Sequence, residues 1–376
     1  MKFQYYLPVN LVFGRGTCEQ IGVQSAKCGK KALIVTGRHS TKVSGLLGRA
    51  VKSLQAAGVE TVVFDEVERN PLTTTVAAGA ALANQENCDV VVALGGGSIM
   101  DAAKGIAFMA CNDGDINDYI FARKTSEKAL PLVLVPTTCG TGSEGNGFAV
   151  LSNPETKDKK SLRGSMIVAK ASIIDPELMT TMPKKVLASV GFDALCHNME
   201  AYISGLSQPL TDMMALEGMA LIGENLPKVY QNPADMDAWE ALTWGSTLGG
   251  MVINTAGVAG PHGMEHPASG LKNIVHGCGL AALTPVIYRH SISGAPEKFA
   301  EISRRLGGKN ELDCVARIEA LLDEINLHIT LGEQEITEKD IPWMTENCLK
   351  VSAASMQNHP VHFTKDEIAE LYLEAI

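Results

Sequence analysis

Two short windows in the second half of the sequence concentrate residues that bind divalent metal ions. The first window, GFDALCHNMEAYIS, places Asp193 and His197 four residues apart, on one face of a predicted helix. The second window, GPHGMEHPASGLKNIVHG, contributes His262, His266 and His276. Together the windows hold four of the nine histidines of the chain, which is a strong concentration.

One carboxylate and three imidazoles in a cleft would repel one another if protonated, and a divalent cation stabilises them most readily. Each residue alone also has a structural interpretation. Asp193 could be only a helix N-cap, and each histidine could be only hydrogen-bonded. Jointly they predict a metal site with positions left open for an alcohol oxygen, on iron(II) or on zinc with an expanded shell. The metal would stabilise an alkoxide from which hydride leaves and polarise an aldehyde in reverse.

His266 lies between two of the predicted metal-binding histidines and is the candidate catalytic residue. It would exchange a proton with solvent or line the substrate cleft. A fifth ligand or a structural histidine are the alternatives.

A glycine-rich turn in the stretch DVVVALGGGSIMDAAK follows a predicted buried strand. Gly95, Gly96 and Gly97 allow a ligand to approach the backbone closely, and Ser98 can cap the helix that follows. The free amides at the start of that helix favour a pyrophosphate. Because the spacing is not G-x-G-x-x-G and a tight turn is an alternative, this stretch alone does not establish a dinucleotide site.

Two further segments belong to the predicted cofactor crevice. The loop PTTCGTGSE carries threonines that could bind ribose or nicotinamide, or merely cap a turn, at the same end of the sheet. The first strong strand is followed by Gly37, Arg38 and Ser40. In a cofactor-binding sheet, an acidic residue at this position would bond the hydroxyls of the adenosine ribose and repel a 2′-phosphate. The absence of an acid there, with Arg38 and Ser40 as phosphate partners, favours NADP over NAD.

The elements that must position these residues change type along the chain. Short β-branched runs alternate with helical stretches in the first half, which predicts a doubly wound, mostly parallel α/β domain over residues 1–183. From residue 184 to 376 Ala, Leu, Met and Glu dominate, which predicts an all-helical, metal-binding domain. The clearest predicted strands are Lys31 to Thr36, Thr61 to Phe64, Asp89 to Leu94 and Leu132 to Pro136, with helices at Gly45 to Ala57 and Thr73 to Ala83.

The composition excludes several classes of partner. The net charge of −10, with acids and bases interspersed, argues against nucleic acid. Nine scattered cysteines without a CxxC pair, and no apolar signal core near the start, predict a reduced, cytoplasmic protein. No run of apolar residues is long enough for a membrane span.

The motifs GGGSIMDAAK, PTTCGTGSE, DALCHNMEAYIS and HGMEH, followed by His276, resemble those of the iron-containing (group III) alcohol dehydrogenases, which have a dehydroquinate synthase-like fold. The resemblance spans nearly the whole chain. It implies that the iron ligands are Asp193, His197, His262 and His276. It also implies cofactor contacts at Asn70, Gly95, Gly96, Gly97, Ser98, Asp101, Thr137, Thr138, Thr141 and either Lys159 or Lys160.

The chain departs from many relatives at several positions. Gly37 replaces an acid, as in the NADP-using members. Glu265 and Pro267 flank His266 where small and aliphatic residues are usual, which suggests an altered substrate side of the cleft. His359 and His362 stand near an altered Asn-Pro-Arg segment; we expect them in a surface loop, and a position facing the cleft is the alternative.

These observations predict an alcohol dehydrogenase or aldehyde reductase that uses NADP (alternatively NAD) and Fe²⁺ (alternatively Zn²⁺) on small primary alcohols, diols or aldehydes. A glycerol dehydrogenase-like enzyme with NAD and zinc is the alternative within the fold. A lyase like dehydroquinate synthase would need several basic residues, and the motif windows of the second half hold only Lys272. By analogy we expect a homo-oligomer, such as a dimer.

Overall fold

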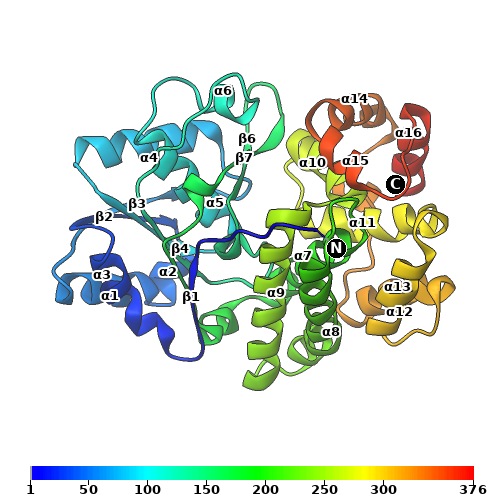
Figure 1. The fold of residues 1–376 in the computed structure, drawn as a ribbon, viewed down its shortest axis with the longest axis horizontal. Coiled ribbons are helices and arrows are strands. Elements are labelled where there is room, and N and C mark those ends of the chain that lie inside the picture. Colours follow the sequence, from blue (N-terminus) through cyan, green and yellow to red (C-terminus); the bar gives the residue numbers. More distant parts are fainter. Residues whose placement is uncertain (1) are drawn as a thin grey trace.

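The chain forms two domains that lie side by side, one built on a parallel sheet and one made of helices (Figure 1). The computed structural model describes residues 2–376. This arrangement confirms the predicted fold class. The last strand ends at Ile174 and the first long helix begins at Lys184, while the predicted boundary between residues 183 and 184 stays a prediction.

The main sheet has six parallel strands in the order β1-β8-β5-β4-β2-β3. Its central strands are buried on both faces: Leu33 and Val35 pack with the helices of one side, Ala32 and Ile34 with those of the other. Strands covered on both faces form near-continuous apolar runs, which is why they were predictable. The strands are β1 (Asn10–Phe13), β2 (Lys31–Gly37), β3 (Glu60–Val67), β4 (Val90–Gly95), β5 (Leu132–Pro136) and β8 (Ala171–Ile174).

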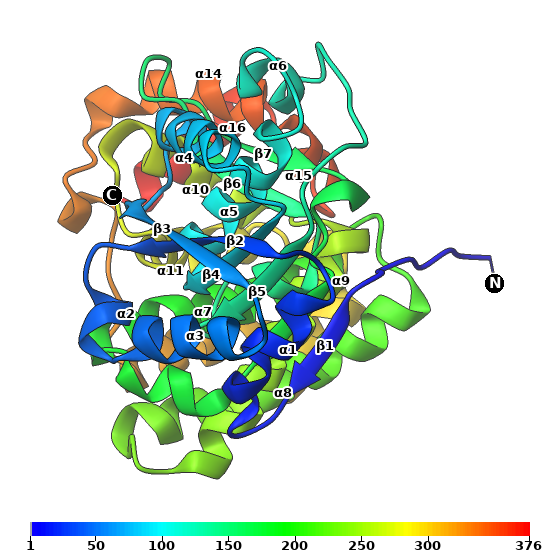
Figure 2. The same cartoon turned by 90° about the vertical axis from the view of Figure 1, so that its left-hand side faces the viewer.

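Helices cover both faces of this sheet, as Figure 2 shows with α1 and α3 on one side and α4 and α5 on the other. Layers of helix, sheet and helix bury the apolar residues of every central strand. The helices of this domain are α1 (Ile21–Ala26), α2 (Ser40–Val43), α3 (Leu46–Ala56), α4 (Thr73–Gln85), α5 (Gly97–Met109) and α6 (Ile116–Ile120).

The strand order reverses between β2 and β4. The chain leaves β2 for the edge strand β3 and then crosses to the other side of β2, where β4 and β5 follow. Ligands of doubly wound proteins bind at such a switch point, beyond the carboxyl ends of the strands. The glycine-rich turn after β4 lies at this position.

A two-stranded antiparallel hairpin, β6 (Phe148–Ser152) and β7 (Lys159–Arg163), lies outside the main sheet and was not predicted. The segment KKSLR is too polar to give a strand signal in the sequence. In Figure 1 the hairpin lies on the side of the sheet domain that faces the helical domain.

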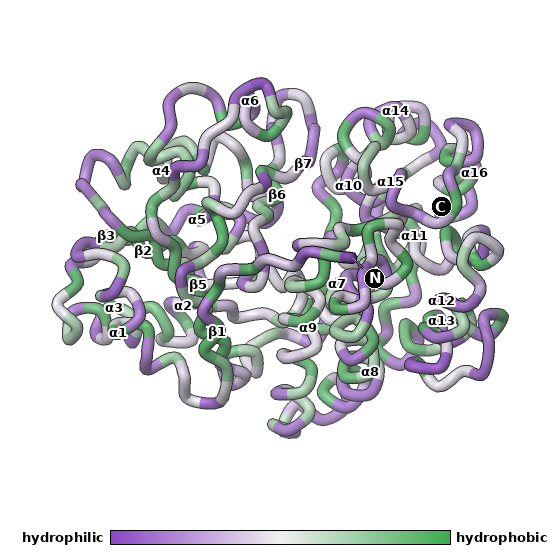
Figure 3. Tube along the Cα trace, in the orientation of Figure 1, coloured by the Kyte–Doolittle hydropathy of each residue, from purple (hydrophilic) through white to green (hydrophobic). Residues whose placement is uncertain are grey.

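Among the described residues of the second domain, the regular elements are all helices. Helix α7 is buried along most of its length because it packs against α8, α9 and α11. Figure 3 shows hydrophilic segments mainly in the peripheral loops of both domains. The helices are α7 (Lys184–Ile203), α8 (Pro209–Gln231), α9 (Met236–Ala256), α10 (Gly260–Lys272), α11 (His276–Arg289), α12 (Pro296–Arg305), α13 (Cys314–Glu324), α14 (Ile341–Val351), α15 (Ala353–Asn358) and α16 (Lys365–Glu374).

Among residues 2–376, none of the helices combines the length and the apolar character that crossing a bilayer requires.

Candidate metal centre and cofactor cleft

Three helices bring the predicted metal-binding residues together. Asp193 and His197 lie one turn apart on α7, His262 lies in the first turn of α10, and His276 begins α11. The Oδ1 atom of Asp193 lies 3.3 Å from Nε2 of His262, 3.6 Å from Nε2 of His197 and 3.7 Å from Nε2 of His276. Ligand atoms that share one ion in tetrahedral geometry lie about 3.4 Å apart, so these spacings suit a metal.

The polar atoms at this centre lack other partners. Asp193 Oδ1 and His262 Nε2 are buried and form no hydrogen bond with any of the described residues. Asp193, His262 and His276 offer ligand atoms that all lie within 4.8 Å of one another. Because unsatisfied buried polar atoms are costly, the donor set fits a divalent ion. Asp193 lies inside α7, which excludes the N-cap interpretation.

The electrostatics of the centre favour positive charge between the ligands. Burial lowers the pKa of His197 to about 4, so this imidazole is neutral and can donate its lone pair. Burial also disfavours charge on His262, but Glu200 and Asp193 outweigh it and raise the pKa of His262 to about 10. Burial raises the pKa of Asp193, and the three histidines more than offset this, so its pKa is lowered overall.

Glu200 holds His262 and the start of α10, and sequence analysis missed it. Its Oε1 lies 2.6 Å from Nδ1 of His262, and its Oε2 accepts from the backbone amides of Ala259 (2.7 Å) and His262 (3.3 Å). A carboxylate on Nδ1 leaves Nε2 free to bind a metal. The signal was present, since Glu200 follows Asp193 by seven residues and lies on the same helix face.

His266 lies beside this centre. Its ring is stacked on that of His276, with centroids 5.8 Å apart, and lies edge-on to His262 at 6.1 Å. Burial, followed by the charge of Lys159, lowers the pKa of His266 well below 6.5. The side chain lines the cleft as a neutral imidazole.

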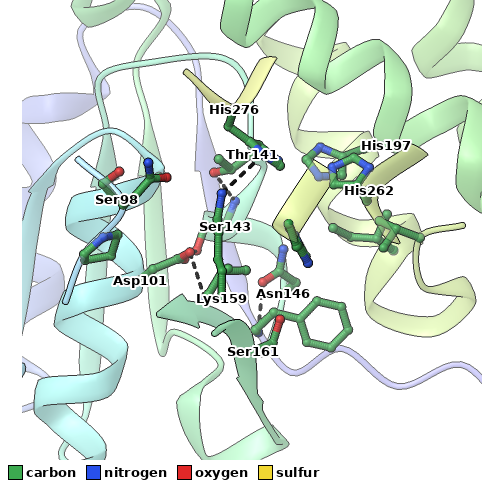
Figure 4. A pocket seen from close by; sticks show the side chains of 18 of the residues that line it. Ser98, Asp101, Thr141, Ser143, Asn146, Lys159, Ser161, His197, His262 and His276 are labelled. Atoms are coloured by element: carbon green, nitrogen blue, oxygen red, sulfur yellow. Dashed lines mark hydrogen bonds between the residues drawn. The ribbon is translucent and has the colours of Figure 1, made fainter. Parts of the chain in front are cut away.

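A cavity joins the centre to the glycine-rich turn. Figure 4 shows its walls, with Ser98 and Asp101 on one side and the histidines on the other. Among the predicted cofactor residues, those that line it are Asn70, Gly97, Ser98, Asp101, Thr141 and Lys159. The predicted residues outside its lining are Gly37, Arg38, Ser40, Gly95, Gly96, Thr137, Thr138 and Lys160.

The two loops after β4 and β5 contact each other. A Cβ atom placed on Gly96 would lie 2.7 Å from Thr138 Oγ1, and one on Gly97 would lie 2.3 Å from Thr141 Cγ2. Only glycine allows this approach. The prediction that both loops face one crevice is therefore confirmed.

The prediction that Ser98 caps α5 is wrong. The helix begins at Gly97 with Gly96 as its N-cap, and no described side chain caps it. Ser98 lies within the first turn and points into the cavity instead (Figure 4). Gly97 and Ser98, the first two residues of this helix, line the cavity.

Asp101 and Asn70 have structural partners at the edge of the cavity. Asp101 accepts from Ser143 Oγ (2.7 Å) and from the amide of Val150 (3.0 Å). Burial raises the pKa of Asp101, and the nearby Lys104 opposes this. Asn70 Nδ2 donates to Asn273 Oδ1 (2.7 Å), which links the two domains.

The structure separates the two adjacent lysines. Lys159 is buried in the cavity wall, with its Nζ 3.3 Å from His276 Nδ1. Lys160 donates to the carbonyl of Val351 at 2.7 Å and lies over the ring of Phe121. Lys159 is therefore the lysine that faces the cleft.

The end of β2 is open and basic. Arg38 and Ser40 are exposed, and Gly37 leaves room beside Ile99. Lys42, which sequence analysis missed, lies beside them and forms an ion pair with Asp65 of β3, and this contact lowers the pKa of Asp65. Asp65, whose pKa the charge of Arg38 also lowers, is thus already paired with a lysine.

The expectation that His359 lies in a surface loop is wrong, whereas His362 is exposed. His359 is buried against the start of α10: its Nδ1 accepts from the amide of Gly260 (3.3 Å), and its Nε2 lies 2.7 Å from Ser291 Oγ. The side chain does not line the cavity.

Comparisons with known proteins match both halves of the chain to one family. The model of the iron-containing alcohol dehydrogenases matches residues 8–176, and that of the C-terminal domain of the Fe-containing alcohol dehydrogenase family matches residues 187–376. The chain is 35% identical to 1,3-propanediol dehydrogenase of Klebsiella pneumoniae, over 99% of this chain and 98% of the relative. It is 32% identical to NAD-dependent methanol dehydrogenase of Bacillus methanolicus, over 99% of each chain.

Solved structures show the same fold. An archaeal halo-thermophilic alcohol dehydrogenase from a Red Sea brine pool superposes with a TM-score of 0.96 at 34% identity, covering 100% of this chain and 99% of that one. A 1,3-propanediol oxidoreductase gives a TM-score of 0.93 at 34% identity, covering 100% of both chains. Family models match both domains in order, and these likenesses extend over the whole length. This chain belongs to the iron-containing alcohol dehydrogenase family and is an oxidoreductase.

Proposed function

We propose that the protein is a metal-dependent alcohol dehydrogenase or aldehyde reductase that moves a hydride between NADP(H) and a small primary alcohol, diol or aldehyde. The observation that carries this proposal is the convergence of three imidazoles on Asp193 Oδ1, at 3.3 to 3.7 Å, in the cavity that also contains the glycine-rich turn. A metal ligand set and a pyrophosphate seat in one cavity suit hydride transfer.

Asp193, His197, His262 and His276 would hold Fe²⁺, with Zn²⁺ as the alternative. The ion would supply Lewis acidity that favours the alkoxide form of the alcohol. Neutral His266, which faces the same cavity, would pass the alcohol proton toward solvent. Phe148, Ile253 and Val258 give the cavity an apolar wall, which excludes water and suits a short alkyl chain.

The cofactor would lie along the carboxyl ends of the strands, with its pyrophosphate at the start of α5 and the threonines of the adjacent loop beside it. Asp101, Asn70 and Lys159 would bound its nicotinamide end, since they line the cavity next to the metal-binding residues. Gly95, Gly96 and Thr138 shape the turn by close contact.

We propose a preference for NADP because Arg38, Ser40 and Lys42 surround the open end of β2. Lys42 already neutralises Asp65, which leaves the guanidinium of Arg38 for a 2′-phosphate. One relative is named an NAD-dependent methanol dehydrogenase, and this name is an argument for NAD as the cofactor instead. Arg38→Gln should raise the KM for NADPH by about tenfold or more and leave that for NADH unchanged, in a steady-state assay with both cofactors. Equal KM values for both cofactors in the unaltered enzyme would contradict the preference.

The substrate class is supported by relatives whose names specify small substrates, 1,3-propanediol and methanol. We further propose a cytoplasmic homo-oligomer, such as a dimer. All nine cysteines are free thiols, which suits a reducing compartment.

The test is oxidation of NADPH with butyraldehyde, followed by absorbance, before and after chelation and refilling with iron or zinc. We expect activity to disappear on chelation and to return with metal. His262→Ala should lose metal and activity together, by at least about a hundredfold, because it removes one ligand of the ion. The exposed His362→Ala is the matched control and should keep both. Full activity of His262→Ala, or of the chelated enzyme, would refute the proposed centre.

A further inference from the structure

A second buried carboxylate contacts the candidate metal centre from outside the ligand set. Glu265, on α10, is fully buried. Its Oε1 accepts from Ser269 Oγ, and its Oε2 contacts Nδ1 of His276. Lys159 Nζ lies 3.6 Å from the same Oε2. Each oxygen of this carboxylate thus has its own partner.

The helical domain makes room for this side chain. A Cβ atom on Gly279, in the first turn of α11, would lie 2.9 Å from Glu265 Cγ and 3.1 Å from its Oε1. Any larger residue at 279 would push the carboxylate away from His276. The packing around Glu265 therefore suits a glutamate that reaches the first residue of α11.

The contact determines which nitrogen of His276 carries the proton. Two groups face Nδ1 of His276: the Glu265 carboxylate, which only accepts, and Lys159 Nζ at 3.3 Å, which only donates. When Nδ1 carries the proton it donates to Glu265, and the Lys159 ammonium forms its ion pair with the same carboxylate at 3.6 Å. In the neutral imidazole the lone pair then lies on Nε2, the atom that faces Asp193 Oδ1 at 3.7 Å. Glu200 contacts Nδ1 of His262 in the same way.

The same carboxylate reaches across the domain boundary. Lys159 belongs to β7 of the sheet domain, whereas Glu265 belongs to the helical domain. The two domains approach closely at Gly270 of α10, where a Cβ atom would lie 2.2 Å from the carbonyl oxygen of Lys157, two residues before β7, and 3.7 Å from Lys159 Cβ. The Lys159–Glu265–His276 contacts therefore join the cofactor side of the cleft to the candidate metal ligands.

We propose that Glu265 is a positioning residue that fixes His276 with Nε2 directed at the metal and ties this ligand to Lys159 across the cleft. The inference rests on the metal site proposed above. Carboxylates on the outer nitrogen of a metal-bound imidazole set both its tautomer and its orientation, and their loss typically weakens metal binding about 10- to 100-fold.

Glu265 itself is not a ligand in this proposal, although Glu265, His266 and His276 also form a group with metal-like spacing. Its two oxygens are engaged by Ser269 and His276, and the ammonium group of Lys159 already supplies a positive charge beside them. A second divalent ion there would be repelled by the lysine.

The test compares Zn²⁺ and Fe²⁺ affinities of the intact protein and Glu265→Gln by competition with a chelator. Glutamine keeps the shape and can still accept from Ser269, but its NH₂ donates to Nδ1 and shifts the proton to Nε2. We expect metal affinity to fall about 10- to 100-fold. Asp158→Asn is the matched control, because it removes a buried carboxylate of the same domain contact, bonded to Asn347 and Lys350, and should leave metal affinity unchanged.

A second measurement keeps the inference testable if Glu265→Gln does not fold. In ¹⁵N spectra of the metal-free native protein, with His276→Asn for assignment, His276 should carry its proton on Nδ1. Unchanged metal affinity in Glu265→Gln, or an Nε2–H tautomer of His276, would overturn the role of Glu265 alone. Absence of metal binding in the native protein would overturn the metal site as well.

Discussion

At the scale of single residues, carboxylates and imidazoles outside the ligand set hold the candidate metal centre in place. Glu200 binds both His262 and the amides at the start of α10. His359 accepts a hydrogen bond from the amide of Gly260, the first residue of α10 and six residues before His266. Each contact fixes the helix start from which the histidines project, so their geometry does not depend on the metal alone.

His359 should make folding sensitive to acid. Burial lowers the pKa of His359 to about 4 from its ordinary value of 6.5, opposed by Glu200 and reinforced by His362. Because the unfolded chain takes up this proton first, the stabilising contribution is complete above pH 6.5 and is lost as the pH falls toward 4. The loss should approach about 3 kcal/mol. Urea unfolding at pH 7.5, 5.5 and 4.5 measures it.

Two variants serve as controls for this prediction. His359→Asn can still accept from Gly260 but cannot titrate, so its free energy of unfolding should depend less on pH over this range. His362→Asn, at an exposed position, should follow the native protein. Identical pH profiles for native protein and His359→Asn would mean that His359 does not contribute.

Whether the role of a residue could be predicted from the sequence depends on how far apart in the chain its contact partners lie. The spacing of Asp193 and His197 on one helix face is enough to identify half of the ligand set from the sequence. Glu200 could have been predicted by the same argument, because it lies on the same helix face. His359 and Glu265 were not, because Gly260, Ser291 and Gly279 come to them only through helix packing.

At the scale of elements, the loop after β5 is held against α5 by a buried lysine. Lys104 Nζ lies 2.6 to 3.1 Å from oxygens of Ser143, Asn146 and Phe148. Asp101, one turn earlier on α5, binds Ser143 as well. Burial lowers the pKa of Lys104 to about 8, and Asp101 opposes this. These contacts therefore tie the loop that forms the cavity wall to α5.

Lys104→Met should destabilise the protein by about 3 kcal/mol, because it leaves Asp101 and several carbonyl groups buried without their cation. It should also weaken cofactor binding, since Ser143 and Asn146 line the cavity. Urea denaturation and cofactor titration measure the two effects. Lys228→Met removes only an exposed pair with Glu224 and should cost at most about 0.5 kcal/mol. A stable Lys104→Met protein would contradict this interpretation.

Whether a strand could be predicted from the sequence depends on how completely its faces are covered. β2, β4 and β5 consist mainly of apolar residues because both faces are covered, and their bounds were close to the prediction. In the hairpin, β7 (KKSLR) is polar because Lys159, Ser161 and Arg163 line the cavity, so no apolar alternation marks it, whereas its partner β6 (FAVLS) is a short apolar run.

At the scale of the whole molecule, the cleft depends on close backbone contact between the domains. A Cβ atom on Gly250, in α9, would lie 1.9 Å from the carbonyl oxygen of Gly142, and one on Gly142 would lie 2.4 Å from Gly250 Cα. Gly142 follows Thr141 directly, with φ at 57°. The threonine loop is thus placed by α9 of the other domain.

Gly250→Ala should destabilise the protein by roughly 1–3 kcal/mol, because backbone on both sides of the contact must move. Its thermal midpoint should fall, and cofactor affinity should fall with it as the Thr141 loop shifts. Gly48→Ala is the matched control: this exposed position in α3 has open space, so alanine should stabilise by up to about 1 kcal/mol. An unchanged thermal midpoint for Gly250→Ala would show that the two backbones can move apart without cost, which would contradict the prediction.

The division into a sheet domain and a helical domain was visible in the sequence, because alternating strand and helix patterns stop near Asp175. The way the domains meet was not. It depends on single contacts such as Asn70 with Asn273 and Lys159 with Glu265, which no periodic pattern encodes.

The most direct test of the metal centre is anomalous X-ray scattering at the iron absorption edge from crystals of the iron-loaded protein. We predict one peak coordinated by Asp193 Oδ1 and by Nε2 of His197, His262 and His276, at about 2.0–2.2 Å from each. A peak held instead by Glu265, His266 and His276, or no peak in the cleft of an active crystal, would contradict it.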